Sequence, residues 1–173
     1  AKGIPNFHIF GEVYDHDPAM LARFTRVDRY PAVLDFAFQT TATDVANGVK
    51  GTDALAKLFM ADAVYEGGED GAMQLPTFLG NHDMGRIGGF IAKAHPQASD
   101  EELLARATLA HALMMFSRGV PSIYYGDEQG FAGIGGWCIA ALGARCFAQG
   151  LAVPMQAHLR AEDGPVHVGK AAH

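Results

Sequence analysis

Short apolar runs recur along the chain, and polar residues follow them. The runs cover residues 7–13, 32–38, 75–79 and 122–125. Their aromatic and β-branched residues predict buried strands. Acidic and polar residues stand at the exits of three of these runs: Glu12, Asn81-His82-Asp83 and Asp127-Glu128.

Two longer segments between these runs have the periodicity of helices. Residues 52–64 carry apolar side chains at positions 55, 58, 59 and 63. Residues 99–116 begin with Ser99 and Glu102 in the spacing of a capping box. Apolar residues then recur on one face from Leu103 to Met115, which predicts a helix packed against a sheet.

The order of these elements predicts an α/β fold. Strands that alternate with helices and are apolar throughout are typical of a parallel sheet covered on both faces. Four strand–helix units in about 130 residues correspond to half of a (β/α)8 barrel, which takes about 250 residues. An open doubly wound sheet is the alternative, but the glycine-rich phosphate turn that it often carries is missing. Polar residues just past the strands favour the barrel.

Composition narrows the classes of partner. The chain has 173 residues, 49% of them hydrophobic, and a formal net charge of −6. This balance predicts no binding to nucleic acid, while a neutral sugar remains compatible. The sequence has no run of 18 apolar residues, so we expect no membrane span. Cys138 and Cys146 fit neither a zinc ribbon nor a disulfide framework, and ordinary thiols are expected.

Both ends of the sequence carry expectations about domain organisation. The chain begins at Ala1 without Met or a signal-like stretch, so we expect the natural polypeptide to start upstream. Its localisation is therefore open, and secretion or a periplasmic location is compatible with a signal upstream. We expect residues 1–136 to form one catalytic-domain segment. Residues 137–173 lack clear periodicity and are interpreted as an atypical tail, with an off-frame translation as one hypothesis.

Three segments read in order carry a family resemblance. They are Phe-Gly-Glu-Val at 10–13, Phe-Leu-Gly-Asn-His-Asp at 78–83 and Gly-Val-Pro-Ser-Ile-Tyr-Tyr-Gly-Asp-Glu at 119–128. Together they resemble glycoside hydrolase family 13, the α-amylase family. The resemblance implies that they are the fifth, seventh and eighth strands of a catalytic barrel, with residues 32–38 as the sixth.

The resemblance also implies roles in a retaining cleavage of α-glucans. Glu12 resembles the general acid/base, which needs a raised pKa for this role. Asp83 resembles the carboxylate that fixes sugar hydroxyls, while His82 and Asn81 resemble substrate-binding residues. The family's nucleophile, an Asp after the fourth strand, has no counterpart in this chain, so we expect an incomplete fragment whose partner is the N-terminal half of the barrel. The implied substrate is an α-glucan or oligosaccharide; no cofactor is required, and calcium is optional.

Several interpretations of the same residues stay open. The turn at Gly80–Asp83 could belong to a metallophosphoesterase, although the other metal-ligand motifs of that class are missing. The chain could also be a catalytically inert glucan-binding fragment. Asp15-His16-Asp17 is interpreted as solvated loop charge rather than a metal site. Asp127-Glu128 fits a cleft-shaping pair or loop charge equally, and Tyr14, Tyr124 and Tyr125 fit sugar stacking or packing.

Overall fold

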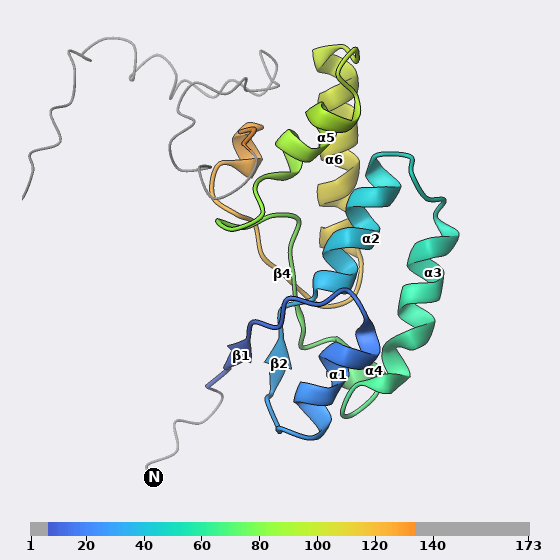
Figure 1. Cartoon of the computed structure of the whole chain (residues 1–173), viewed down its shortest axis with the longest axis vertical. Coiled ribbons are helices and arrows are strands. Elements are labelled where there is room, and N and C mark those ends of the chain that lie inside the picture. The colour runs from blue at the N-terminus through green and yellow to red at the C-terminus, as the bar shows by residue number, and fades with distance from the viewer. Residues whose placement is uncertain (1–6, 134–173) are drawn as a thin grey trace, which may run out of the picture.

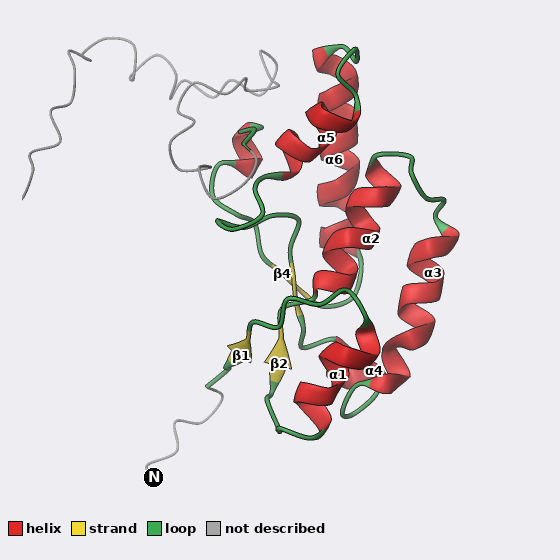
Figure 2. Cartoon of the chain, in the orientation of Figure 1, coloured by secondary structure: helices red, strands yellow, loops and turns green. Residues whose placement is uncertain are grey.

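The structure is a computed structural model that describes residues 7–133 of the chain. Each of its strands is two residues long, and helices connect them (Figure 2). The strands are β1 (Phe10–Gly11), β2 (Ala32–Val33), β3 (Pro76–Thr77) and β4 (Val120–Pro121). The helices are α1 (Pro18–Arg26), α2 (Phe36–Ala46), α3 (Asp53–Met60), α4 (Glu69–Ala72), α5 (Ile87–Ala94) and α6 (Asp100–Phe116), with 3-10 turns η1 (Ala61–Val64) and η2 (Asp127–Gln129).

The strands pair in parallel, as the sequence predicts. β1 pairs with β2, with Phe10 opposite Ala32, and β3 pairs with β4, with Pro76 opposite Val120. One backbone hydrogen bond of 3.0 Å, from the Asp35 amide to the Pro76 carbonyl, links the two pairs. The strands therefore follow one another in space in the same order as in the chain.

The runs 7–13, 32–38 and 75–79 each contain a strand that is shorter than predicted. The run 32–38 leaves the strand after Val33, because the Asp35 side chain accepts a hydrogen bond of 2.9 Å from the Phe38 amide and caps α2. Phe36 and Phe38 are buried in this helix. A short apolar run does not by itself distinguish a buried strand from a buried helix.

The run 122–125 is not a strand. Pairing with β3 occurs earlier in the chain, where the Val120 amide donates to Leu75 and the Ser122 amide donates to Thr77. After Ser122 the chain turns, and the Asp127 amide donates to the Tyr124 carbonyl. The β-branched and aromatic residues of this run therefore lie in a loop and not in a strand.

The two predicted helices are confirmed. α3 and η1 together fill residues 53–64, and α6 begins after Ser99, whose hydroxyl accepts a hydrogen bond of 3.3 Å from the Glu102 amide. The buried side chains of α6 recur every three or four positions: Leu103, Ala107, Ala110 and Met114. Helices α1, α2, α4 and α5 were not predicted.

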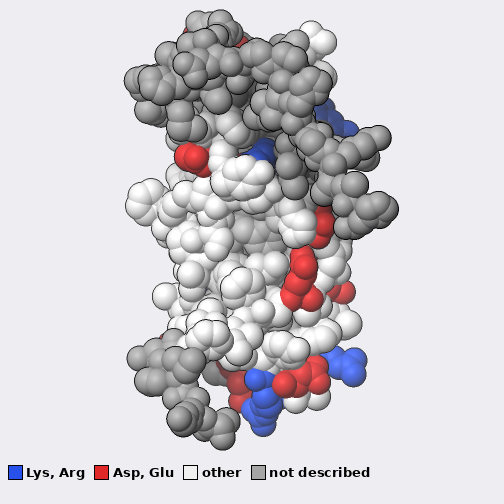
Figure 3. Space-filling model, turned by 90° about the vertical axis from the view of Figure 1, so that its left-hand side faces the viewer, with Lys and Arg blue, Asp and Glu red and all other residues white. Residues whose placement is uncertain are grey.

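Helices α1 to α6 lie on one side of the strands (Figure 1). α2 packs against α3, α5 and α6, and the core lies between these helices and the strands. Half-exposed apolar side chains remain on β1, on β4 and next to them: Ile9, Phe10, Val120 and Ile123. The face shown in Figure 3, on the other side from most of the helices, carries few charges. The sequence predicts helices on both faces of the sheet. Within residues 7–133, helices cover only one face of the strands, so this prediction is wrong for the described part of the chain.

A buried ion cluster joins the strand layer to the helices. The Arg118 guanidinium donates to both Asp62 carboxylate oxygens at 2.7 Å and also to the Asp35 carboxylate. Burial by itself lowers the pKa of Arg118, but its hydrogen bond to Asp62 and the charge of Asp35 outweigh this and raise the pKa. Arg118 therefore remains charged and ties the segment before β4 to η1 and to the start of α2.

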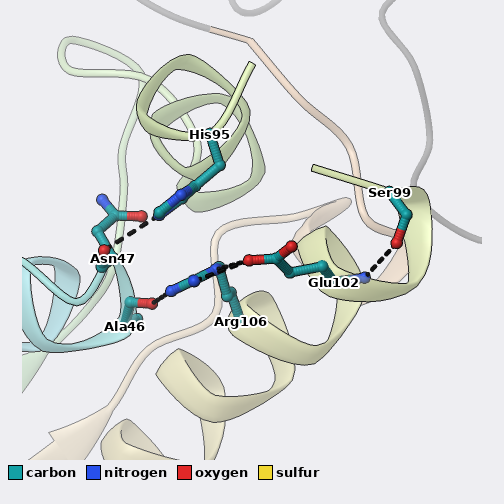
Figure 4. Close-up of polar contacts among 6 residues, drawn as sticks. All are labelled: Ala46, Asn47, His95, Ser99, Glu102 and Arg106. Carbon is teal, nitrogen blue, oxygen red and sulfur yellow. Dashed lines mark hydrogen bonds and ion pairs between the residues drawn. The ribbon is translucent and has the colours of Figure 1, made fainter. Parts of the chain in front are cut away.

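Side chains of α5 and α6 close the C-terminal end of α2 (Figure 4). Arg106 donates to the Ala46 carbonyl at 3.0 Å, and Glu102 holds its guanidinium at 2.8 Å. The His95 Nε2 donates a hydrogen bond of 3.0 Å to the Asn47 carbonyl. The last carbonyls of a helix need such partners, and a cation also stabilises the negative end of the helix dipole.

None of the helices within residues 7–133 is long and apolar enough to cross a bilayer. The expected tail at 137–173, with both cysteines, lies outside the described residues, as does the expected boundary at 136.

Candidate active site

Glu12, the predicted acid/base, follows β1 directly. Its side chain is exposed and forms no hydrogen bond or ion pair with residues 7–133. The residue before it is constrained, since a Cβ on Gly11 would lie 3.3 Å from the Tyr30 ring. The strand end thus presents a carboxyl group that is free to meet a ligand.

Asn81 builds the turn that carries the other predicted residues. Its backbone exchanges two hydrogen bonds of 3.0 Å with Gly85, and its side-chain oxygen accepts the amides of Asp83 and Met84 at 3.0 and 2.9 Å. Gly80 is needed beside it, because a Cβ there would lie 2.2 Å from the Gly85 carbonyl oxygen. The Asn81 side-chain oxygen therefore serves the turn, a role that the sequence analysis did not assign.

His82 and Asp83 occupy the tip of this turn. Their side chains are 65% and 59% exposed, and the His82 Nε2 lies 3.4 Å from an Asp83 carboxylate oxygen. The structure thus brings these two predicted residues together on the surface. Both side chains are accessible to a ligand at the tip.

A row of aromatic rings connects the Glu12 loop with the segment that leads to Asn81. The Tyr14 ring centroid lies 4.7 Å from that of Phe36, and the Phe36 centroid lies 5.0 Å from that of Phe78. These rings follow β1, β2 and β3 respectively. The carboxyl ends of the three strands therefore lie together, and this is the end at which parallel α/β folds place their chemistry.

Arg86 follows the turn directly, is buried beneath it, and was not predicted from sequence. Its side chain is almost fully buried and donates to the Asp127 carboxylate at 3.0 Å and to the Tyr125 carbonyl. The guanidinium carbon also lies 4.3 Å from the centre of the Tyr124 ring. Burial raises the pKa of Asp127 to about 6, although the hydrogen bond from Arg86 opposes the shift. An arginine within an apolar, glycine-rich run at 84–91 was the available signal.

The two other acidic clusters also have structural partners. The Asp17 side chain accepts the Ala19 amide at 2.9 Å at the start of α1, and Asp15 accepts the Asp17 amide at 2.8 Å. Glu128 accepts the Gly126 amide at 2.8 Å. Of the two interpretations of Asp127-Glu128, these contacts favour loop charge over a cleft-shaping pair.

These residues do not fit a calcium site. Within residues 7–133, no group of three or more His, Cys, Asp or Glu side chains could hold a metal ion. Asp15 and Asp17 each use a carboxylate oxygen to accept a backbone amide.

Comparison with known proteins identifies the family. The family model for the α-amylase catalytic domain matches residues 2–158. The chain belongs to the α-amylase family. The domain of this family is a (β/α)8 barrel, which agrees with the parallel strands and intervening helices described above.

Relatives of this α-amylase family member include an α-amylase and a glucanotransferase. An α-amylase of Streptomyces lividans is 47% identical over 135 residues, which cover 78% of this chain and 15% of that protein. A cyclomaltodextrin glucanotransferase of Paenibacillus macerans is 33% identical over 103 residues, covering 60% of this chain and 13% of that protein. The chain thus spans less than a fifth of the length of either relative.

A solved structure shares the fold of this α-amylase family member. The crystal structure of an α-amylase from Geobacillus thermoleovorans, complexed with acarbose, superposes with a TM-score of 0.64 at 21% identity. The match covers 76% of this chain and 28% of that one. Most of this chain therefore corresponds to about a quarter of that solved chain.

Proposed function

We propose that this chain supplies the acid/base and sugar-binding side of a retaining active site that cleaves α-glucosidic bonds in α-glucans. The contact between Tyr14, Phe36 and Phe78 carries the proposal, because it groups the strand ends from which the loops of Glu12 and Asp83 depart. The exposure of both carboxyl groups adds support, since a substrate must reach them.

In the proposed first step, Glu12 donates its proton to the glycosidic oxygen while the bond from this oxygen to the anomeric carbon breaks. A carboxylate nucleophile attacks the anomeric carbon from the other face and forms a glycosyl ester. Glu12 then removes a proton from water, or from a sugar hydroxyl in transfer, and the incoming oxygen displaces the nucleophile. Asp83 and His82 bind hydroxyls of the sugar that becomes the glycosyl group.

The nucleophile comes from outside residues 7–133 in this proposal. We propose that residues 1–136 are the C-terminal half of a barrel, corresponding to its fifth to eighth strands, and that the N-terminal half provides the nucleophile. The exposed apolar side chains of Ile9 and Phe10 at β1, and of Val120 and Ile123 at β4, support this. A partner strand at each edge would bury them and satisfy the unpaired backbone.

The partner half also has a chemical task at Glu12. A carboxyl that donates a proton near neutral pH needs a pKa well above that of a solvated glutamate, and burial or a nearby carboxylate provides this. Glu12 is exposed in this chain. We expect closure of the barrel to cover it and to bring the nucleophilic carboxylate close.

The test is to join the chain to the upstream half found in its genomic context and to measure release of reducing ends from starch and formation of transfer products. We expect activity in the joined protein, loss of more than about a thousandfold in Glu12→Gln, and no activity in the chain alone. The matched control is Glu101→Gln, which changes an exposed glutamate on α6 and should act like the parent. Full activity of Glu12→Gln, or activity of this chain alone, would contradict the proposal.

A further inference from the structure

A groove runs between α2 and α5 on the helical side of the molecule. Its volume is about 470 Å³, within the roughly 300–1,000 Å³ typical of small-ligand pockets. Met84, next to Asp83 of the turn, lines one part of it, and Lys93 lines another. The groove therefore adjoins the candidate active site without including Glu12, His82 or Asp83.

Hydrogen bonds hold the two walls of the groove together. Gln39, which is buried, donates to the Leu79 carbonyl at 3.1 Å and so anchors α2 to the segment before the turn. Near the last turn of both helices, His95 donates to the Asn47 carbonyl at 3.0 Å (Figure 4). The groove is thus formed before any ligand binds, which reduces the entropy cost of binding.

The lining has one apolar and one polar part. Phe90 and Met84 are partly buried and give an apolar surface, whereas Thr43, Asp44 and Lys93 add polar groups. The Thr43 oxygen accepts a hydrogen bond of 3.3 Å from Gln39, so its hydroxyl proton is free to be donated. One Asp44 carboxylate oxygen is paired with Lys50 at 2.8 Å, which leaves the other oxygen available.

Lys93 is the cation of this groove. It is exposed and forms no ion pair with residues 7–133. A sugar ring offers an apolar C–H face and a rim of hydroxyls that both donate and accept. An aromatic ring beside a hydroxyl, a carboxylate and an ammonium group complements both features.

We propose that this groove is a second sugar-binding site, which holds a segment of α-glucan next to the candidate active site. The choice of an α-glucan as ligand rests on the proposed function. α2 and α5 lie away from the exposed edge at β1 (Figure 1), so we expect the site to stay open when the barrel is complete. It holds the polymer while a neighbouring segment reaches Glu12.

The test is a titration of the isotope-labelled chain, alone and joined to its N-terminal half, with maltotriose, followed by amide NMR shifts. We expect shifts at Thr43, Phe90 and Lys93. Lys93→Met and Phe90→Leu should each raise the Kd on the order of five- to tenfold, because each removes one contact but preserves most of the packing. Lys57→Met, at an exposed lysine on α3, is the matched control and should leave the Kd unchanged.

A second variant separates this site from the candidate active site. Asp83→Asn should leave the shifts in the groove intact. Unchanged binding by Lys93→Met together with loss of binding in Asp83→Asn would overturn the groove proposal and leave the proposed function standing. Shifts in the groove without starch hydrolysis by the joined protein would support the groove and count against the proposed function. Equal shifts from the β-linked trisaccharide cellotriose would overturn the preference for α-glucan.

Discussion

The buried ion cluster around Arg118 allows a sharp test of what holds the strand layer to the helices. The variant Arg118→Met keeps an apolar stem of similar length but removes all three hydrogen bonds to Asp35 and Asp62. The Asp35 and Asp62 side chains are 0% and 6% exposed. Both carboxylates would therefore lose their counter-ion in a site that water hardly reaches.

The expected cost follows from this burial. Removing one partner of a buried pair typically destabilises a protein by about 3–5 kcal/mol, because a charge remains buried without compensation. Asp35 also caps α2 through the Phe38 amide, so its reorientation would weaken that helix. We expect a loss of about 4 kcal/mol in the free energy of unfolding, measured by urea denaturation with circular dichroism at an unchanged m-value.

Two further variants test whether the loss of stability comes from uncompensated buried charge. Arg29→Met breaks a pair whose side chains are 72% and 52% exposed and should cost about 1 kcal/mol or less. The triple variant Asp35→Asn, Asp62→Asn, Arg118→Met removes every charge of the cluster and should be more stable than Arg118→Met alone. A cost below about 1 kcal/mol for Arg118→Met would refute the argument that the cluster is held by compensated buried charge.

Three other changes have defined outcomes. Burial raises the pKa of Asp127 to about 6, so protonation favours the folded state. The resulting contribution to stability is present below about pH 4 and is lost as the pH rises through 6. Asp127→Asn should remove up to about 3 kcal/mol of this pH dependence, measured from urea midpoints. Gly80→Ala forces a Cβ to within 2.2 Å of a carbonyl oxygen and should cost about 1–3 kcal/mol in urea, with loss of the amide protection of Gly85. Arg106→Met removes the hydrogen bond to the Ala46 carbonyl and should cost about 1 kcal/mol, with faster hydrogen exchange at the end of α2.

Each of these three changes has a control or a contrary result. For Asp127, equal slopes of stability against pH in parent and variant would show that its carboxyl is not the titrating group. Gly51→Ala meets only the exposed Asp53 side chain and should be tolerated far better than Gly80→Ala. Unchanged exchange at Ala46 in Arg106→Met would show that water satisfies this carbonyl equally well.

The elements predicted well from sequence are those fixed by neighbours along the chain. Helix α6 is one, because Ser99 and Glu102 define its start and the spacing of Leu103, Ala107, Ala110 and Met114 defines its buried face. The prediction of a strand over residues 32–38 is wrong after Val33, because a short apolar run has the same pattern in a buried helix and in a buried strand. The cap of α2 is a local contact, from the Phe38 amide to the Asp35 side chain. The tertiary structure decides that Asp35 is buried between β3 and Arg118, so that the strand ends at Val33.

The residues of the candidate site likewise divide into those that the sequence predicts and those that only the structure reveals. Glu12, His82 and Asp83 were proposed from sequence, because the order of the motifs and their position after apolar runs can be read from the chain. Arg86 was not, because its significance comes from Asp127, a residue 41 positions away that shares its buried site.

The sequence by itself determined the family, the helix limits set by local capping, and the identity of the candidate site residues. The tertiary structure decided how long the strands are, which face of them helices cover, that Asn81 shapes the turn rather than only pointing at a ligand, and that a groove lies between α2 and α5. The physical reason is that capping and periodicity act over a few residues, whereas burial, ion pairing and cavities depend on segments that are distant in the chain and meet only when it folds.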